Sequence, residues 1–268
     1  MGTVAVWIDG RECRAREGEP LLRVARREGF DIPALCYHEA LEPYGACRLC
    51  VVEVVAGAPL GLTTSCTLAA VDGLEVRTDT DEVVENRRIL LELYLAEAPA
   101  SGELRDFAAR YGVTESRFAR PPSPEEAENK CILCGLCIRV CGEVLGVHAI
   151  SYVGRGPGTR VNSPYLEPSG VCIGCGACAY VCPTGAITIQ DVADRRVIET
   201  WSGTSVPLAT CERCGTRFAA QPALGVAYQS FSGLADELKG LCPDCRRNWV
   251  TREVFLAENE RRSQSADS

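Results

Sequence analysis

The sequence contains little lysine and no long apolar run, and each shortage excludes a class of protein. Only Lys130 and Lys239 are lysines among its 28 basic residues, and the net charge is −8. Without a dense basic stripe, we expect no nucleic-acid partner. No run approaches the roughly 20 apolar residues that cross a bilayer, and the N-terminal residues lack a charged region followed by an apolar one. We therefore expect a cytoplasmic protein with no membrane span.

Nucleotide-binding glycine patterns are also missing. The glycine-rich stretch GRGPG at 154–158 fits neither GxGxxG nor GxxxxGKS, so we interpret it as a loop. No nicotinamide or flavin fingerprint occurs, and residues 191–268 are too few to hold a hydrogenase or molybdenum domain. The chain is therefore expected to contribute no catalytic residues of its own.

Cysteine, by contrast, is abundant, and its spacing carries most of the information. The chain has 17 cysteines, and disulfides are rare in a reducing cytoplasm, so CxxC pairs indicate metal thiolates. Sixteen of the 17 fall into groups with metal-ligand spacing. The remaining one, Cys13, is expected to be a small buried apolar residue.

The first group keeps a close CxxC pair and a distant fourth cysteine, and consists of Cys36, Cys47, Cys50 and Cys66. Four thiolates of this kind suit a 2Fe-2S centre. The small residues Gly45 and Ala46 would let backbone amides approach the sulfur atoms. His38 raises the alternative of a Rieske centre, but that centre needs two histidines, so we expect a hydrogen-bonded histidine instead. Four buried core cysteines without metal are the remaining alternative.

Two further runs, CILCGLCIRVC and CIGCGACAYVCP, repeat the bacterial ferredoxin pattern CxxCxxCxxxC. In two-cluster ferredoxins the fourth cysteine of each run binds the other cluster. One 4Fe-4S cluster is thus predicted at Cys131, Cys134, Cys137 and Cys182. The other is predicted at Cys172, Cys175, Cys178 and Cys141.

A fourth group consists of two CxxC pairs separated by 27 residues, with ligands Cys211, Cys214, Cys242 and Cys245. Paired knuckles of this type build tetrahedral four-thiolate sites, and Gly215 permits the tight turn of a zinc ribbon. Zinc is the preferred metal. A third 4Fe-4S cluster is the alternative, because four thiolates alone do not separate zinc from iron, and reduced thiols without metal are a third possibility.

The predicted fold is α+β with four structured parts. The pattern of residues 1–80 predicts a β-grasp 2Fe-2S ferredoxin domain. It indicates strands at 3–8 and 11–16 joined by a tight Asp9-Gly10 turn. A helix starting at Pro20 and capped by Gly29 should follow, and then strands at 51–55 and 74–77. The other parts are a helical connector and linker at 81–124, interrupted at 99–102, a two-cluster 4Fe-4S ferredoxin domain at 125–190, a four-cysteine zinc-ribbon-like unit at 191–250, and a polar tail at 251–268.

These motifs together resemble a known family. GACRLCVVEV, CILCGLCIRVC, GRGPGTRV and CIGCGACAYVCPTGAI resemble the small iron-sulfur subunit of NAD-linked hydrogenases over residues 3–190. That subunit is similar to the N-terminal part of the large iron-sulfur subunit of complex I, and to the same module of NAD-dependent formate dehydrogenases and iron-only hydrogenases. The resemblance implies a non-catalytic subunit that relays electrons between a flavin- and NAD(P)-binding subunit and a metal-containing catalytic subunit of a hydrogenase. A formate dehydrogenase or a complex I-like NADH dehydrogenase is the alternative.

One departure from the family affects the expected electron path. Members often carry an additional 4Fe-4S cluster held by one His and three Cys, whereas the stretch between Cys66 and Cys131 contains neither residue type. The route from the first domain to the ferredoxin domain is therefore open at this stage. Two other classes, a metal-sensing interaction protein and a self-contained enzyme, are weaker alternatives, because the first needs a basic face and the second an active site.

Overall fold

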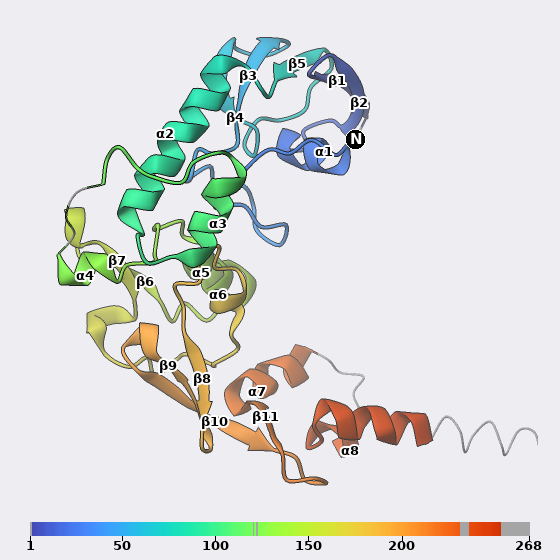
Figure 1. Cartoon of the computed structure of the whole chain (residues 1–268). Coiled ribbons are helices and arrows are strands. Elements are labelled where there is room, and N and C mark those ends of the chain that lie inside the picture. The colour runs from blue at the N-terminus through green and yellow to red at the C-terminus, as the bar shows by residue number, and fades with distance from the viewer. Residues whose placement is uncertain (1, 120, 122, 231–235, 253–268) are drawn as a thin grey trace, which may run out of the picture. The chain divides into compact units, whose positions relative to one another are not determined.

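A computed structural model of the chain describes residues 2–119, 121, 123–230 and 236–252 (Figure 1). Arg120 and Pro122 of the predicted linker and most of the predicted polar tail lie outside the described residues. The chain divides into two compact units. Unit 1 runs to residue 162 and includes 177–187, and unit 2 consists of 163–176 and the residues from 188 onward.

Unit 1 begins with a five-stranded sheet in the order β2-β1-β5-β3-β4, in which β1 and β5 are parallel. Its elements are β1 (Thr3–Ile8), β2 (Arg11–Arg16), α1 (Leu21–Arg27), β3 (Val51–Ala56), β4 (Gly61–Thr64) and β5 (Leu74–Arg77). The predicted β-grasp domain is confirmed. The Asp9-Gly10 turn has φ values of 52° and 77°, which match the right-handed twist of the flanking strands.

The start of α1 and strand β4 differ from the prediction for this domain, whereas the end of α1 agrees with it. Pro20 occupies the N-cap position with ψ 128°, so the helix begins one residue later than expected. Gly29 has φ +83° just after α1, as predicted for its C-terminal cap. Strand β4 was not predicted; it pairs antiparallel with β3, with Val51 opposite Thr64.

The connector consists of two helices, α2 (Asp81–Glu97) and α3 (Gly102–Arg110), and the predicted interruption between them is confirmed. Side-chain oxygens of Thr80 and Ser101 accept backbone N–H groups of the first turns and so stop each helix from extending backward. Figure 1 shows α2 running from the sheet toward the one-turn helix α4 (Pro124–Ala127). A capping box between Ser123 and Glu126 supports α4, which begins at the end of the predicted linker.

The ferredoxin part of unit 1 contains short helices and one hairpin. Its elements are α5 (Leu136–Arg139), a π-helical turn (Val140–Val144), β6 (Ser151–Val153), β7 (Arg160–Asn162) and α6 (Ala177–Tyr180). The GRGPG stretch connects β6 to β7 through a 3-10 turn at Gly156–Gly158, in agreement with its interpretation as a loop. A second 3-10 turn, Pro164–Leu166, belongs to unit 2.

Unit 2 is built around a four-stranded antiparallel sheet in the order β11-β10-β9-β8, which was not predicted from the sequence. Its elements are β8 (Ile189–Val192), β9 (Arg195–Ile198), a 3-10 turn (Glu199–Trp201), β10 (Thr204–Thr210), β11 (Arg217–Ala220), α7 (Gln221–Ser230) and α8 (Asp236–Lys239). Residues 243–252 are also helical. Within the described part of the chain, no helix has the length and apolar character needed to cross a membrane.

Candidate cysteine-ligated metal centres

The β-grasp domain gathers the first cysteine group in its interior. The chain between α1 and β3 supplies three of these cysteines and the residues after β4 supply the fourth; all four are at most 2% exposed, namely Cys36, Cys47, Cys50 and Cys66. The thiols form two hydrogen-bonded pairs, one between Cys36 and Cys47 and one between Cys50 and Cys66. A 2Fe-2S centre needs two thiolates on each of two irons. Two pairs of thiols fit that requirement.

In each pair, hydrogen bonding lowers the pKa of one thiol. The hydrogen bond with Cys36 lowers the pKa of Cys47 to about 6, and the one with Cys66 lowers the pKa of Cys50 to about 7. The same bonds raise the pKa of Cys36 and Cys66. Backbone N–H groups add to this, since Leu35 donates to Cys47 Sγ at 3.4 Å and Cys47 donates to Cys36 Sγ at 3.2 Å. Cys47 and Cys50 are therefore the more readily ionised members of the group, and the thiolate is the form that binds metal.

Two residues near this group, Gly45 and His38, have defined contacts. Gly45 has φ +70°, and a Cβ there would lie 3.3 Å from Thr67 Cγ2, so the backbone approaches closely at this point. His38 Nδ1 accepts the backbone N–H of Ala40 at 3.2 Å, and its ring meets Tyr180 edge-on at 6.2 Å. The His38 imidazole thus accepts one hydrogen bond and contacts one aromatic ring.

The first ferredoxin run and Cys182 come together within unit 1. Burial raises the pKa of Cys131, Cys134 and Cys137, that of Cys134 to about 12, and the charge of Cys182 adds a smaller contribution. Val181, next to Cys182, packs in one apolar cluster with Leu136 of the first run. Backbone amides donate to sulfur here as well, Leu133 to Cys131 Sγ at 3.4 Å and Ala186 to Cys182 Sγ at 3.3 Å. The structure therefore places the fourth cysteine of the second run beside the first run.

The α3 helix helps to hold the segment that carries Cys182. Its N-cap residue Ser101 donates its hydroxyl to the backbone carbonyl of Thr184 at 2.9 Å. Gly185 approaches the same helix so closely that a Cβ there would lie within 3 Å of the Glu103 carboxylate. Connector and ferredoxin segment are therefore packed together at this point.

The remaining predicted ligands belong to both units and are described separately. In unit 1, Cys141 Sγ accepts the backbone N–H of Ala149 at 3.3 Å, and Cys178 lies on α6. In unit 2, Cys172 is half-buried and Cys175 is exposed. The ligand set proposed for the second cluster therefore rests on its spacing in the sequence.

In unit 2 the sheet packs directly on the loop between Cys172 and Cys175. Arg196 on β9 forms a two-bonded ion pair with Asp191 and donates to the backbone carbonyl of Gly174 at 3.0 Å. The Asp191 carboxylate and, to a smaller extent, the thiol of Cys175 raise the pKa of this guanidinium. A fixed positive charge thus lies close to a predicted cluster ligand.

The C-terminal group is the most compact of the four. The sulfur atoms of Cys211, Cys214, Cys242 and Cys245 all lie within 4.8 Å of one another. The Cys214 and Cys242 sulfurs are 3.7 Å apart, close to the ~3.8 Å edge of a tetrahedron with Zn–S bonds of about 2.3 Å.

Backbone geometry around this group resembles that of a metal knuckle. Cys242 N–H donates to Cys211 Sγ at 3.3 Å, which lowers the pKa of Cys211 to about 6. Gly215, at φ +72°, donates its N–H to the carbonyl of Cys211 and closes the turn. Phe218 and Trp249 pack against the group as core residues.

Among the described residues, no other group of three or more metal-binding side chains is this compact. A single ion draws its thiolates to one point, whereas a cluster spreads them because they bind different irons.

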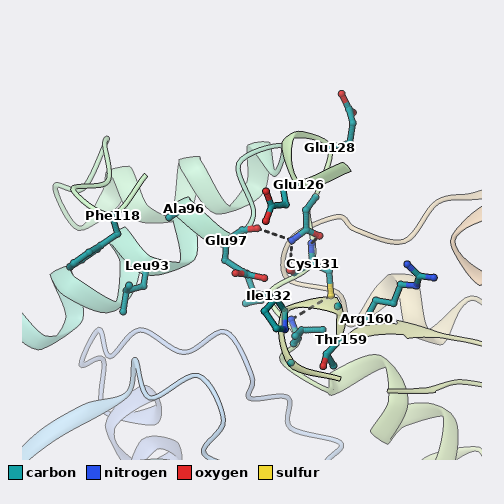
Figure 2. A pocket seen from close by; sticks show the side chains of 15 residues that line it. Leu93, Ala96, Glu97, Phe118, Glu126, Glu128, Cys131, Ile132, Thr159 and Arg160 are labelled. Atoms are coloured by element: carbon teal, nitrogen blue, oxygen red, sulfur yellow. Dashed lines mark hydrogen bonds between the residues drawn. The ribbon is translucent and has the colours of Figure 1, made fainter. Parts of the chain in front are cut away.

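A pocket that the sequence did not reveal opens beside the first ferredoxin run. Figure 2 shows Leu93 and Glu97 of α2 on one side, and Thr159 and Arg160 on the other. Cys131 is among the lining residues, so this predicted ligand faces the pocket. Asn129 fixes the loop there by donating to the Glu97 carbonyl at 2.7 Å and accepting from Cys131 N–H at 3.0 Å.

Comparison with known families identifies the same parts. A 2Fe-2S iron-sulfur cluster binding domain matches residues 2–81, and a 4Fe-4S dicluster domain matches residues 171–219. The second match includes Cys211 and Cys214 together with the second ferredoxin run, and begins after the first run. The predicted 2Fe-2S and 4Fe-4S domains are confirmed.

The chain is 32% identical over 234 residues to an NADH-quinone oxidoreductase subunit of Rhizobium meliloti (strain 1021), a match that covers 80% of this chain and 27% of that protein. It is 34% identical over 214 residues to an NADP-reducing hydrogenase subunit, HndD, of Solidesulfovibrio fructosivorans, covering 70% of this chain and 36% of the relative. In the crystal structure of an NAD+-reducing NiFe-hydrogenase in the H2-reduced state, one chain matches with a TM-score of 0.57 and 28% identity, covering 69% of this chain and 86% of that one.

The chain is similar to subunits of NAD(P)-linked oxidoreductases. The resemblance predicted from its motifs is thereby confirmed. The chain spans about a quarter to a third of the length of these two curated relatives.

Proposed function

We propose that the chain is an electron-transfer subunit that relays single electrons between a flavin- and NAD(P)-binding subunit and the metal-containing catalytic subunit of a multi-subunit hydrogenase. Two relatives support this role, because one is a subunit of an NADP-reducing hydrogenase and the other belongs to an NAD+-reducing hydrogenase. A 2Fe-2S or 4Fe-4S centre supplies one-electron chemistry when bound, while the protein positions it and sets its surroundings.

The ligands follow from the cysteine groups. We assign the head group, defined as Cys36, Cys47, Cys50 and Cys66, to the 2Fe-2S centre. The first ferredoxin group, defined as Cys131, Cys134, Cys137 and Cys182, is assigned to one 4Fe-4S cluster. A second 4Fe-4S cluster is assigned to Cys172, Cys175, Cys178 and Cys141. Buried thiols that accept backbone N–H groups support the first two assignments, since such bonds stabilise thiolates.

The observation that carries the proposed relay is the closeness of the head group to the first ferredoxin group. Cys36 and Cys47 belong to the same apolar cluster as the buried Ile132 and the half-buried Cys134. The charge of Cys47 contributes to the raised pKa of Cys134. The two groups are therefore neighbours, although no cysteine or histidine occurs in the sequence between them. This proximity supports direct electron transfer between the head group and the first ferredoxin group.

For the C-terminal group we propose a structural zinc ion. Its four sulfurs are as close as a single tetrahedral ion requires, and three of its cysteines are buried. The 4Fe-4S dicluster match over Cys211 and Cys214 favours the alternative of a third 4Fe-4S cluster. Metal analysis of the purified chain distinguishes the two.

Metal content therefore tests the cofactor assignment. Two, four and four irons plus one zinc give about ten irons and one zinc per chain. About 14 irons without zinc would identify the C-terminal site as a cluster. Substantially fewer than ten irons after anaerobic reconstitution would contradict the proposed cluster set.

The relay itself is tested by comparing turnover with cluster reduction. We expect the isolated chain to show reducible clusters but no NADH oxidation with an artificial acceptor. NADH turnover by the chain alone would contradict a purely electron-transferring role. Cys47→Ser should alter the 2Fe-2S signal in electron paramagnetic resonance and spare both 4Fe-4S signals. Loss of all three signals would contradict the separation of head and ferredoxin domains.

A complex I-like NADH dehydrogenase is the second candidate, because one relative is a subunit of an NADH-quinone oxidoreductase. A formate dehydrogenase would use the same relay. Copurification of the tagged chain from its native cells, followed by assays for hydrogen-, formate- and quinone-dependent turnover, distinguishes these complexes. Hydrogen-dependent NAD(P) reduction is the outcome expected from the proposal.

A further inference from the structure

Tyr94 lies on the face of α2 that points into the apolar cluster shared by the two cysteine groups. It follows the buried Leu91 by three residues, so the two side chains share one helix face, and it packs against the same apolar cluster as the buried C-cap residue Ala98. The phenol hydroxyl donates to the backbone carbonyl of Cys47 at 3.0 Å. Tyr94 is thus bonded to a predicted ligand of the head group.

The same side chain also lies near the first ferredoxin group. Tyr94 and Cys134 both pack against the apolar cluster that contains Cys36 and Cys47. One aromatic residue therefore contacts the surroundings of both groups.

The hydroxyl has a definite electrostatic effect at this position. A carbonyl oxygen carries partial negative charge, and a hydrogen bond donated to it offsets part of that charge. Reduction adds negative charge to a centre held by thiolates, and donors near its ligands make that addition easier. Loss of the hydroxyl should consequently make the head centre harder to reduce.

We propose that Tyr94 is the positioning residue that couples the head group to the first ferredoxin group: its hydroxyl sets the potential of the head centre through Cys47, and its ring fixes the spacing between Cys47 and Cys134. This inference rests on the proposed function, because it requires that both groups hold clusters.

The neighbouring Tyr111 provides a matched control. It packs in the same apolar cluster, but its hydroxyl donates to the Asp31 carboxylate, with distances of 3.1 and 3.2 Å to the two oxygens. Tyr111→Phe therefore removes a hydroxyl from the same region without touching the Cys47 carbonyl.

The test is a potentiometric titration of the cluster-loaded full chain, followed by electron paramagnetic resonance. Tyr94→Phe should shift the midpoint potential of the 2Fe-2S centre to more negative values and leave the second 4Fe-4S cluster unchanged, whereas Tyr111→Phe should shift neither. Tyr94→Leu, which removes the ring, should also weaken the relaxation enhancement of the 2Fe-2S signal by the neighbouring reduced cluster.

The results separate this inference from the proposed function. An unchanged 2Fe-2S potential in Tyr94→Phe, or an equal shift in Tyr111→Phe, would overturn the role of Tyr94 while the relay stands. A wild-type chain with no 2Fe-2S signal would overturn the proposed function itself. If Tyr94→Leu loses the head centre but retains the 4Fe-4S signals, the positioning role is supported.

Discussion

Substitution of Gly174 should damage unit 2 for two separable reasons. Gly174 has φ +66°, a conformation that costs an L-residue about 1–2 kcal/mol. A Cβ there would also lie 2.3 Å from Val206 Cγ2 and 3.0 Å from Ala220 Cβ. Both neighbours are buried on the sheet, and valine is stiff at χ1, so the overpacking should cost about 1–3 kcal/mol more. Gly174→Ala should therefore destabilise unit 2 by about 2–5 kcal/mol.

Gly203 provides the control that isolates the packing cost. It has φ +67°, but a Cβ at this position meets no atom within 4 Å. Gly203→Ala should therefore show only the backbone cost of about 1–2 kcal/mol. In a unit of this size, about 1 kcal/mol corresponds to roughly 4–8 °C in unfolding temperature. Gly174→Ala should unfold at least about 4 °C below Gly203→Ala.

Thermal unfolding followed by tryptophan fluorescence measures this difference, because Trp201 is buried in unit 2. Adding Val206→Ala to Gly174→Ala should recover part of the loss, since it removes the atom that the new Cβ would meet. Equal unfolding temperatures for the two glycine variants, or no recovery in the double variant, would refute the packing argument.

Two further predictions concern buried charges. Arg117→Gln should destabilise the chain at pH 7, because it leaves Glu92, only 2% exposed, without its 2.6 Å ion pair. Arg117 is the main cause of the lowered pKa of Glu92, so this stabilisation is present above the ordinary glutamate pKa of about 4.3 and is lost as the pH falls through the folded value. The gap in unfolding temperature between variant and wild type should shrink from pH 7 to pH 4, whereas Arg247→Gln, which breaks an exposed pair, should show no gap at either pH. Arg87→Met should lower the 2Fe-2S midpoint potential by some tens of millivolts, because it removes a buried cation that interacts with Cys50. Arg88→Met, which removes an exposed neighbouring cation, should leave the potential unchanged. Equal shifts in the two variants would contradict the electrostatic cause.

Local patterns were enough to predict much of the head domain. The alternation at 3–8, the Asp9-Gly10 turn and Gly29 each specify backbone geometry within a few residues. Strand β4 escaped prediction because it has four residues and is half-exposed except at Thr64. Strands β8 and β9 of unit 2 escaped for a similar reason, since β8 has no buried residue and β9 has only Ile198.

The candidate sites could be predicted only as far as spacing in the sequence reaches. Each cysteine group was predicted from its intervals, and so was the assignment of Cys182 to the cluster of the first run. The closeness of Cys47 to Cys134 could not be found in this way, because 86 residues separate them and the contact depends on how α2 packs. Tyr94 gave no signal for the same reason, since an aromatic residue on an apolar helix face is most often plain core.

The length of α2 before Tyr94 is consequently under a periodic constraint. Each added residue turns a helix by about 100° and lengthens it by about 1.5 Å. A single insertion between Thr80 and Tyr94 would swing the phenol off the cysteine-facing side, whereas seven added residues, close to two turns, would restore its direction about 10 Å further along the axis. The number of residues between Thr80 and Tyr94 therefore fixes both the direction and the position of the phenol. Homologous chains that keep the contact with Cys47 can vary this number only if the 2Fe-2S domain moves together with the helix.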